Sequence, residues 1–271
     1  MTNIKIQDLY IYPVKSLGGI RVEQAVLEER GLQFDRRWML VDENNRFFSQ
    51  REMSRLALFS LSQHNSGFKI QARFAEEAEF DIPFKIQEGK SIQVTVWDDL
   101  CSAIEYVEGS NWFSKQLDIK CKLVYMPDST DRFVEREYAM NNEIVSFSDG
   151  YPLLLIAQES LDDLNERLQV PIGMQRFRPN IVTIGSKAFE EDIWKQIRIN
   201  DIEVEIAKAC ARCVIPSINP ATAEIEKEPN ATLSMFRKRD NKIYFGQNLL
   251  HKNGGLVSCG NEVKVIEMLK I

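Results

Sequence analysis

The 271-residue sequence contains little histidine and none of the common nucleotide-binding motifs. Its two histidines, His64 and His251, lie in no recognisable catalytic pattern, and we expect both at the surface. Because histidine is the commonest general base and a frequent metal ligand, histidine-based catalysis is disfavoured. No G-x-G-x-x-G or P-loop pattern is present, so the usual signals of dinucleotide or nucleoside triphosphate binding are missing.

The sequence also lacks long apolar runs and an excess of positive charge. No segment approaches the roughly 20 apolar residues that a helix needs to cross a bilayer, and the N-terminal residues resemble no leader peptide. Acidic residues number 40 and basic residues 34, for a net charge of −6, which gives no overall field for binding nucleic acid. We therefore expect no membrane and no nucleic-acid partner.

The cysteines do not form a disulfide framework. There are five, an odd number, at positions 101, 121, 210, 213 and 259, and their spacing shows no regular pattern. Because unpaired thiols persist in reducing compartments, the expected location is the cytoplasm.

Short β-prone segments separated by turns dominate the pattern. We predict hairpins over 38–48 and 196–206, a helix over 111–117 and a second helix capped by Ser160. The remaining strands are predicted at 5–12, 22–28, 68–72, 91–97, 121–125 and 181–184; residues 151–157 are an apolar run, and 260–266 is a turn followed by a closing strand. Many short strands with few helices indicate a mainly β protein with some α (α+β), built from barrels or sandwiches.

A charged segment poor in large aliphatic residues, 128–142, interrupts this pattern. Such a segment is typical of a domain boundary or an active-site loop. We therefore predict two domains, residues 1–127 and 128–271, both of ordinary size for a domain.

The segment Cys210-Ala211-Arg212-Cys213 is the most distinctive candidate site. A zinc site is disfavoured because a second cysteine pair is missing. A thiol–disulfide pair usually opens a helix, which Pro216 and Pro220 oppose, although a disulfide is not excluded. A single reactive or metal-ligating thiolate, with Arg212 lowering its pKa, is the third alternative, and two structural cysteines are the fourth.

Basic residues recur where strands meet loops, beside aromatic residues and prolines. Lys15-Ser16 follows the first strand, Arg36-Arg37 precedes Trp38, and Arg178 precedes Pro179-Asn180. Guanidinium groups and backbone amides bind anions well. Together with the cysteine segment, they predict a site for an anionic ligand.

These motifs resemble a known family over nearly the whole chain. Tyr12-Pro13-Val14-Lys15-Ser16 and Asp35-Arg36-Arg37-Trp38 are similar to the β-barrel domain that precedes MOSC domains. The segments 146–164, 177–182, 210–213 and 245–248 are similar to the MOSC domain itself. The resemblance is closest to mitochondrial amidoxime reducing components and bacterial relatives that detoxify N-hydroxylated bases. It implies an N-terminal β-barrel-like domain followed by a MOSC β-barrel domain.

The resemblance also implies a molybdenum cofactor, molybdopterin carrying molybdenum. The second cysteine of the family's motif ligates the metal, which makes Cys213 the metal ligand and catalytic residue. The implied cofactor-binding residues are Lys15, Ser16, Arg36, Ser148, Asp149, Gly150, Arg178, Asn180, Ala211 and Arg212. Gly150 stands where relatives have threonine and Ala211 where many have serine, so contacts there would come from backbone amides.

The implied activity is reduction of N-hydroxylated compounds such as amidoximes and hydroxylamines. Longer bacterial relatives carry a cysteine-rich ferredoxin domain, and no four-cysteine cluster follows the last predicted strand here. We therefore expect a separate electron donor, a ferredoxin or a flavoprotein reductase. The alternative is a sulfur or molybdenum-cofactor carrier that uses Cys213 without turnover.

Overall fold

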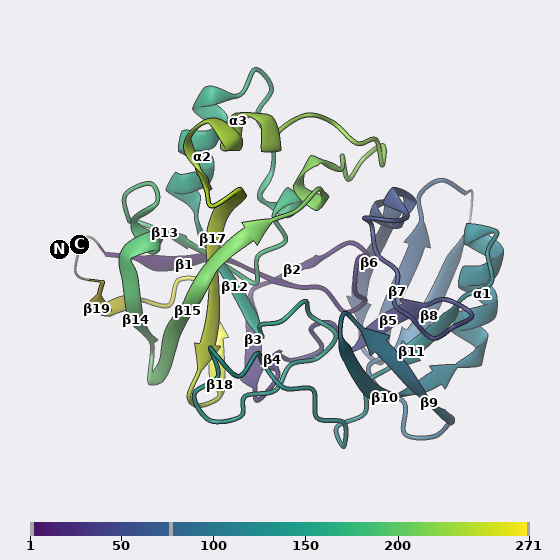
Figure 1. The fold of residues 1–271 in the computed structure, drawn as a ribbon. Helices are drawn as coiled ribbons and strands as arrows, with labels where there is room; N and C mark the ends of the chain where they lie inside the picture. The colour runs from purple at the N-terminus through teal and green to yellow at the C-terminus, as the bar shows by residue number, and fades with distance from the viewer. Residues whose placement is uncertain (1–2, 76–77, 270–271) are drawn as a thin grey trace.

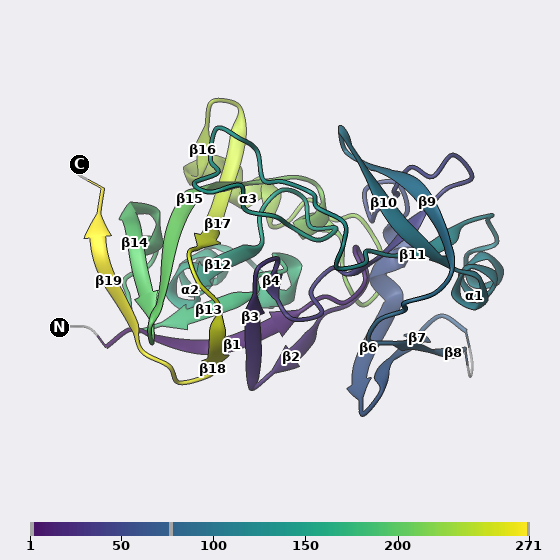
Figure 2. The ribbon, with the colours of Figure 1, turned by 90° about the horizontal axis from the view of Figure 1, so that it is seen from below.

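The computed structural model describes residues 3–75 and 78–269, so the ends of the two predicted domains, residues 1–2 and 270–271, lie outside the described residues. The described part is mainly β, as the sequence predicts, with three α-helices and several short 3-10 turns. Figures 1 and 2 show two halves side by side, with both ends of the chain at the outer side of one half.

The largest sheet carries most of the second half of the chain together with its first strands. Its order is β19-β14-β15-β17-β12-β13-β1-β2, with β16 paired to β17. The bounds are β1 (Lys5–Ile11), β2 (Ile20–Val22), β12 (Leu153–Ala157), β13 (Ile181–Ile184), β14 (Trp194–Ile199), β15 (Ile202–Arg212), β16 (Lys238–Arg239), β17 (Lys242–His251) and β19 (Val263–Met268).

Three smaller sheets complete the β-structure. One has the order β5-β11-β10-β9, one β6-β7-β8 and one β18-β3-β4. The bounds are β3 (Gln24–Glu28), β4 (Gly31–Leu32), β5 (Trp38–Val41), β6 (Phe59–His64), β7 (Gly67–Ala72), β8 (Glu79–Pro83), β9 (Lys90–Val96), β10 (Asp99–Tyr106), β11 (Lys122–Tyr125) and β18 (Gly255–Ser258).

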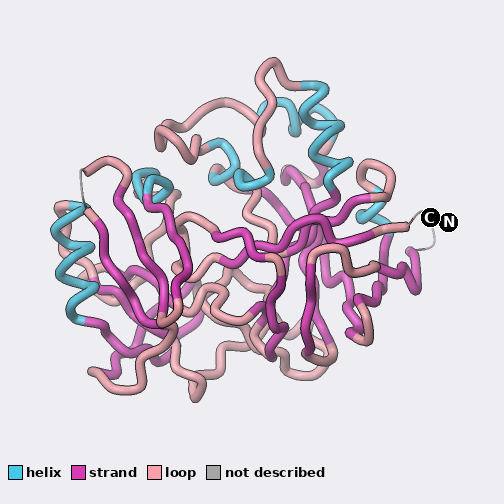
Figure 3. Tube along the Cα trace, turned by 180° about the vertical axis from the view of Figure 1, so that it is seen from behind, coloured by secondary structure: helices cyan, strands magenta, loops and turns pink. Residues whose placement is uncertain are grey.

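The helices cover the sheets at the outer sides of the molecule (Figure 3). Helix α1 (Val107–Leu117) packs on β11. Helices α2 (Gln158–Arg167) and α3 (Asn230–Phe236) contact each other and lie above the large sheet in Figure 1. No helix in the described ranges has both the length and the hydrophobicity needed to cross a membrane.

Strand pairing and core packing join the two predicted domains, residues 1–127 and 128–271. Strand β1 pairs with β13, and β3 pairs with β18. One cluster of buried side chains extends from Phe113 on α1 to Trp194 on β14. The division at residue 127 stays a prediction about domains, but the two parts of the sequence share strands and core.

Three local expectations were wrong. The predicted strand 22–28 is two strands, because the chain leaves the large sheet after β2 and joins β18 through β3. The helix that we expected from residue 111 already begins at Val107. Ser160 does not cap α2, because that helix begins at Gln158; the buried hydroxyl donates instead to Glu191, with oxygen distances of 2.7 and 2.9 Å.

The expectation of two surface histidines is half right. His64 is exposed at the end of β6, whereas His251 is buried at the end of β17. Burial lowers the pKa of His251, and its Nδ1 atom lies 3.3 Å from the Asn253 carbonyl oxygen. A histidine followed by a turn is therefore no proof of exposure, because β17 is a central strand of the large sheet.

Candidate functional site

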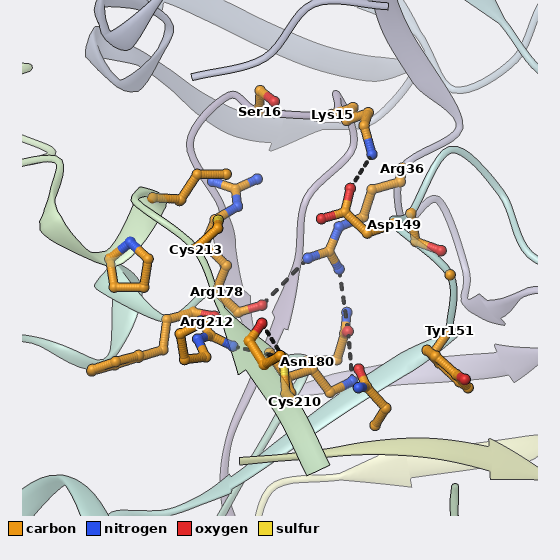
Figure 4. Close-up of a pocket in the computed structure, with 18 of the residues that line it drawn as sticks. Lys15, Ser16, Arg36, Asp149, Tyr151, Arg178, Asn180, Cys210, Arg212 and Cys213 are labelled. Atoms are coloured by element: carbon orange, nitrogen blue, oxygen red, sulfur yellow. Dashed lines mark hydrogen bonds and ion pairs between the residues drawn. The ribbon is translucent and has the colours of Figure 1, made fainter. Parts of the chain in front are cut away.

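All eleven residues that the sequence predicts for the site line one pocket. They come from five chain segments that the fold brings together (Figure 4). Strand β13 runs antiparallel to β1 and parallel to β12. The end of β1 therefore lies beside the starts of β12 and β13, and the segments carrying Lys15, Asp149 and Arg178 meet there.

Three of these residues have left-handed backbone conformations that side-chain-bearing residues rarely adopt. The φ angles are 69° at Ser16, 48° at Arg36 and 58° at Arg178. A non-glycine residue held in this region costs free energy of order 1 kcal/mol, and such residues concentrate at binding sites and catalytic sites. The surrounding contacts therefore fix these three loops in one conformation.

The buried ring of Tyr12 is a platform for two guanidinium groups. The Cζ atoms of Arg36 and Arg178 lie 4.2 and 4.3 Å from the ring centroid, within the range of cation–π attraction. The Tyr12 hydroxyl donates to the carbonyl of Pro179 at 3.1 Å. We call this group of three residues the Tyr12 end of the pocket.

The two guanidinium groups are anchored differently. Arg36 donates to the buried carboxylate of Asp35 at 2.6 Å, whereas Arg178 donates to the carbonyl of Leu17 at 2.6 Å. Burial lowers the pKa of Arg178 to about 10, so the side chain still carries its charge at neutral pH. Arg178 has no ion-pair partner among the described residues, and its charge is available to an anion.

Asn180 connects strands rather than presenting free polar groups. Its Oδ1 atom accepts hydrogen bonds from Arg36 Nη1 and from the backbone N–H of Leu154, both at 3.2 Å. Its Nδ2 atom donates to the carbonyl of Tyr10 at 3.2 Å. The side chain lines the pocket, but both its oxygen and its nitrogen already form hydrogen bonds with protein groups. Direct cofactor binding by Asn180 stays a prediction.

At the opposite end, two cations converge on Asp149. The ammonium group of Lys15 lies 2.6 Å from Oδ1 and also donates to the carbonyl of Phe147 at 2.7 Å (Figure 4). Arg51 donates to Oδ2 at 3.0 Å. We call Lys15, Arg51 and Asp149 the Asp149 end.

These contacts shift the protonation of both partners. Burial lowers the pKa of Lys15 to about 8, against the opposing pull of Asp149. Desolvation by the surrounding protein opposes ionisation of Asp149, but Lys15 and Arg51 hold the pKa of that carboxyl well below its usual range. Asp149 is therefore ionised at neutral pH. Lys15 loses its proton just above neutral pH, because its pKa is about 8.

The two thiols of the cysteine segment have different surroundings. Cys210 lies within β15 and accepts a hydrogen bond from Arg212 Nη1 at 3.0 Å. Cys213 follows the strand directly, is partly exposed and is unbridged. Burial would lower the pKa of Arg51, but Asp149 and the nearby Cys213 side chain raise it. The guanidinium group of Arg51 therefore lies close to the Cys213 side chain.

Two buried polar atoms of the pocket lack partners. Neither Ser148 Oγ nor Arg212 Nε has a hydrogen-bond partner among the described residues. A buried polar atom left unsatisfied costs about 1–3 kcal/mol, so each such atom in a native structure needs an explanation. A polar ligand seated in this pocket would provide one.

Gly150 is not required by the backbone or by packing. Among the described residues a Cβ atom there would meet Glu135 Oε1, at 3.9 Å, and the φ angle of Gly150 lies outside the left-handed region. A threonine would therefore fit, and its absence removes a hydroxyl without changing the shape of the loop.

Three further residues of the site carry no motif in the sequence. Arg51 lies in a mixed-charge segment without a motif, and Trp97 is the last residue of the predicted strand 91–97, with no motif of its own. Arg132 belongs to the charged segment that we expected to be a boundary or a loop. Its guanidinium group donates to the carbonyls of Ser146 and Ser148 at 3.0 and 2.7 Å, and so holds the segment that carries Asp149.

Comparisons with known proteins cover most of the chain. The model of the MOSC N-terminal beta barrel domain matches residues 3–120, and the MOSC domain model matches residues 142–264. The chain is 31% identical over 253 residues to mitochondrial amidoxime reducing component 2 of Rattus norvegicus, covering 88% of this chain and 74% of the relative.

Two other relatives are similar at lower identity. Mitochondrial amidoxime-reducing component 1 of Homo sapiens is 28% identical over 285 residues, covering 96% of this chain and 82% of the relative. Molybdenum cofactor sulfurase of Oryza sativa subsp. japonica is 28% identical over 278 residues, covering 91% of this chain but only 32% of the relative.

Proposed function

The chain belongs to the MOSC domain family, and from this membership we propose that it is a molybdenum-cofactor-dependent oxidoreductase that reduces N-hydroxylated compounds. The observation that carries the proposal is the convergence of Cys213 with unpaired cationic and polar groups in one pocket. The relatives named as amidoxime reducing components supply the reaction class.

The residues of the pocket fit such a cofactor by the chemistry of their donors. Arg178 offers a half-buried charge without an ion-pair partner among the described residues, and Ser148 and Arg212 offer unsatisfied polar atoms. Guanidinium groups and hydroxyls suit a phosphate and a pterin. The thiolate of Cys213 is a soft ligand suited to a redox metal. We assign the cofactor's anionic part to the Tyr12 end and its metal to Cys213.

The reaction is a two-electron reduction. Conversion of R–NH–OH to R–NH₂ consumes two electrons and two protons, breaks the N–O bond and releases one water. The cofactor, when bound, supplies the two-electron chemistry. The chain holds the cofactor, places Cys213 beside Arg51, and keeps the Asp149 end open to solvent, since the Asp149 side chain is 57% exposed.

The electrons and the substrate come from outside the chain in this proposal. We propose a separate one-electron donor, a ferredoxin or a flavoprotein reductase, and a small N-hydroxylated base as substrate. Purified protein supplied with a nicotinamide nucleotide alone is then expected to reduce no amidoxime. Addition of a chemical donor, reduced viologen, is expected to start turnover.

A second candidate function is a carrier of sulfur or of the cofactor. It is favoured by the similarity to a molybdenum cofactor sulfurase, of which this chain matches about one third. In that case Cys213 would hold a persulfide or pass cofactor to a client, and no reductase activity would be found with any donor.

The deciding test is a benzamidoxime reductase assay with reduced viologen on three proteins: wild type, Cys213→Ala and Cys210→Ala. We expect turnover in the wild type, near-complete loss in Cys213→Ala and substantial activity in Cys210→Ala. Equal loss in both variants would indicate a thiol–disulfide mechanism. Cofactor-loaded wild type without turnover would favour the carrier.

A further inference from the structure

The hairpin formed by β16 and the start of β17 lies beside the segment that carries Cys213. In the pairing of β15 with β17, Ala211 is opposite Tyr244 and Arg212 is opposite Ile243. Residues opposite each other in an antiparallel pair carry their side chains on the same face of the sheet. The Tyr244 side chain therefore lies on the same face as that of Ala211, which lines the pocket. In Figure 2 the hairpin projects from the large sheet, and one rim of the pocket continues onto it.

Positive charge is concentrated on this hairpin, residues 238–242, which we call the basic hairpin. Lys238, Arg239 and Lys242 are exposed, and none of the three forms an ion pair with a described residue. Asp240 is the one carboxylate in the segment. Three cations against one carboxylate leave a net charge of +2 on the hairpin, whereas the whole chain carries −6. The basic hairpin is therefore a local reversal of the overall charge.

The conformation of the basic hairpin is fixed by its turn and by one aromatic contact. Asp240 and Asn241 form a two-residue turn with φ angles of 47° and 60°, the left-handed pair typical of tight hairpins. The Cζ atom of Arg239 lies 4.9 Å from the ring centroid of Tyr244, within the range of cation–π attraction. The charge of Arg239 is therefore held near the strand residue that faces the pocket rim.

Exposed apolar side chains lie next to these cations. Met235 is 81% exposed at the end of α3, shortly before the basic hairpin, and Val214 is 36% exposed directly after Cys213. Asn230, at the start of α3, donates to the carbonyl of Cys213 at 2.8 Å, which ties the helix to the cysteine segment. Protein–protein interfaces combine apolar groups with a polar rim and are enriched in methionine and arginine. A surface of this composition is suited to a protein partner.

We infer that the basic hairpin, with Met235 and Val214, is the docking surface for an acidic protein of the ferredoxin type that carries one electron at a time. The inference rests on the proposed function, because that reaction needs electrons from outside the chain. Reduction of one R–NH–OH to R–NH₂ and water takes two electrons and two protons. Two reduced carriers therefore dock in turn, each leaves oxidised by one electron, and the protons come from solvent. The rest of the chain is net negative, so an acidic carrier is attracted at the hairpin and repelled elsewhere.

The inference is tested by binding, without any turnover. An acidic plant-type [2Fe–2S] ferredoxin, in its oxidised form, is titrated by calorimetry into wild type and into the double variant Lys238→Glu/Lys242→Glu, with circular dichroism to confirm folding. At low salt we expect at least tenfold weaker binding in the variant, because two attractive charges become repulsive. Raising the salt from about 0.01 to about 0.1 M is expected to weaken wild-type binding, because the screening length falls from about 30 to about 10 Å. Equal affinities, or no binding to wild type at low salt, would overturn the inference.

The matched control is the double variant Lys85→Glu/Lys115→Glu, which changes the net charge by the same amount. Both lysines are exposed and neither lines the pocket, and neither forms an ion pair with a described residue. Because charges farther away than the screening length contribute little, ferredoxin affinity is expected to stay within about twofold of the wild type. Equal weakening in the two double variants would show an effect of net charge alone and refute the hairpin as the docking surface.

Reductase assays tell failure of the docking surface from failure of the proposed reaction. Reduced viologen is a small cation that needs no docking surface, so Lys238→Glu/Lys242→Glu is expected to keep the viologen-driven rate and to show a raised KM for reduced ferredoxin. Viologen-driven turnover with an unchanged KM for ferredoxin in the variant would leave the reaction standing and remove the docking surface. Ferredoxin binding that depends on the two lysines, in a protein without reductase activity, would leave the docking surface standing and remove the proposed reaction.

Discussion

The two ends of the pocket carry the same charge but differ in access. Each combines two cations with one carboxylate: Arg36 and Arg178 with Asp35, and Lys15 and Arg51 with Asp149. At the Tyr12 end the carboxylate is 3% exposed, whereas the Asp149 side chain is 57% exposed.

The aromatic platforms differ in the same way. Tyr12 is buried under two guanidinium groups, while Trp97 beside Arg51 is partly open to solvent. The closed end is suited to hold a permanent ligand, because buried charges interact strongly. The open end is suited to exchange, because solvent screens its charges and molecules can enter and leave. Charge alone would not have separated these roles.

Arg178→Ala tests the closed end and has the largest expected effect. A charge-assisted hydrogen bond contributes about 1.5–3 kcal/mol, so cofactor retention is expected to fall roughly a hundredfold. Molybdenum and pterin contents of the purified protein measure it. Arg51→Ala, at the open end, is expected to keep most of the cofactor.

The matched control for these variants is Arg167→Ala, whose side chain is 47% exposed, is paired with Asp163 and lies over the ring of Phe236, away from the pocket. Its cofactor content is expected to equal that of the wild type. Equal losses in Arg178→Ala and Arg51→Ala would show that the two ends do not differ in the way that we describe.

Tyr12→Leu tests the platform itself. It removes two cation–π contacts, each contributing about 0.5–2 kcal/mol, and a hydrogen bond to Pro179. The free energy of unfolding is expected to fall by about 2–3 kcal/mol. Tyr12→Phe keeps the ring and is expected to lose only about 1 kcal/mol. Denaturant titration of both variants measures the difference, and similar losses would assign the stabilisation to the hydroxyl instead of the ring.

The smallest predicted effect is a pH dependence at the open end. The pKa of Lys15 is lowered from 10.5 to about 8 in the folded protein. Between these values the unfolded chain binds the proton more tightly, so the free energy of unfolding rises with pH in this window. From pH 7 to pH 9 the expected gain from Lys15 is about 1 kcal/mol.

Lys15→Met lacks this titration. In denaturant titrations of cofactor-free protein its unfolding free energy is expected to change less between pH 7 and pH 9 than that of the wild type. Parallel pH profiles of the two proteins would show that burial does not lower the pKa of Lys15 as we describe. Above pH 8 the wild type also loses the charge that pairs with Asp149, which is expected to loosen the open end.

The sequence predicted what short local patterns determine. Strand β13 and the β14–β15 hairpin follow from nearby residues, whereas the eleven residues of the site follow from the resemblance of short motifs to a known family; the structure brings those eleven residues to one pocket. The sequence did not predict contacts that depend on distant pairing. Arg51 and Trp97 contact Asp149 from 98 and 52 positions away in the sequence.

Burial was equally hard to predict from local patterns. His251 looks like a turn residue in sequence, but β17 lies between β15 and β12 in the large sheet. Ser160 is a residue type typical of helix caps, but its hydroxyl donates to the buried carboxylate of Glu191, thirty-one positions away in the sequence. Both outcomes depend on tertiary neighbours that no window of sequence contains.

Molybdenum K-edge X-ray absorption on cofactor-loaded wild type and Cys213→Ala tests the central claim most directly. Two dithiolene sulfurs of molybdopterin and one thiolate predict three sulfur scatterers in the wild type and two in the variant, with one molybdenum bound per wild-type chain. The same sulfur count in both proteins, or no molybdenum in carefully loaded wild type, would contradict the assignment of Cys213 as the metal ligand.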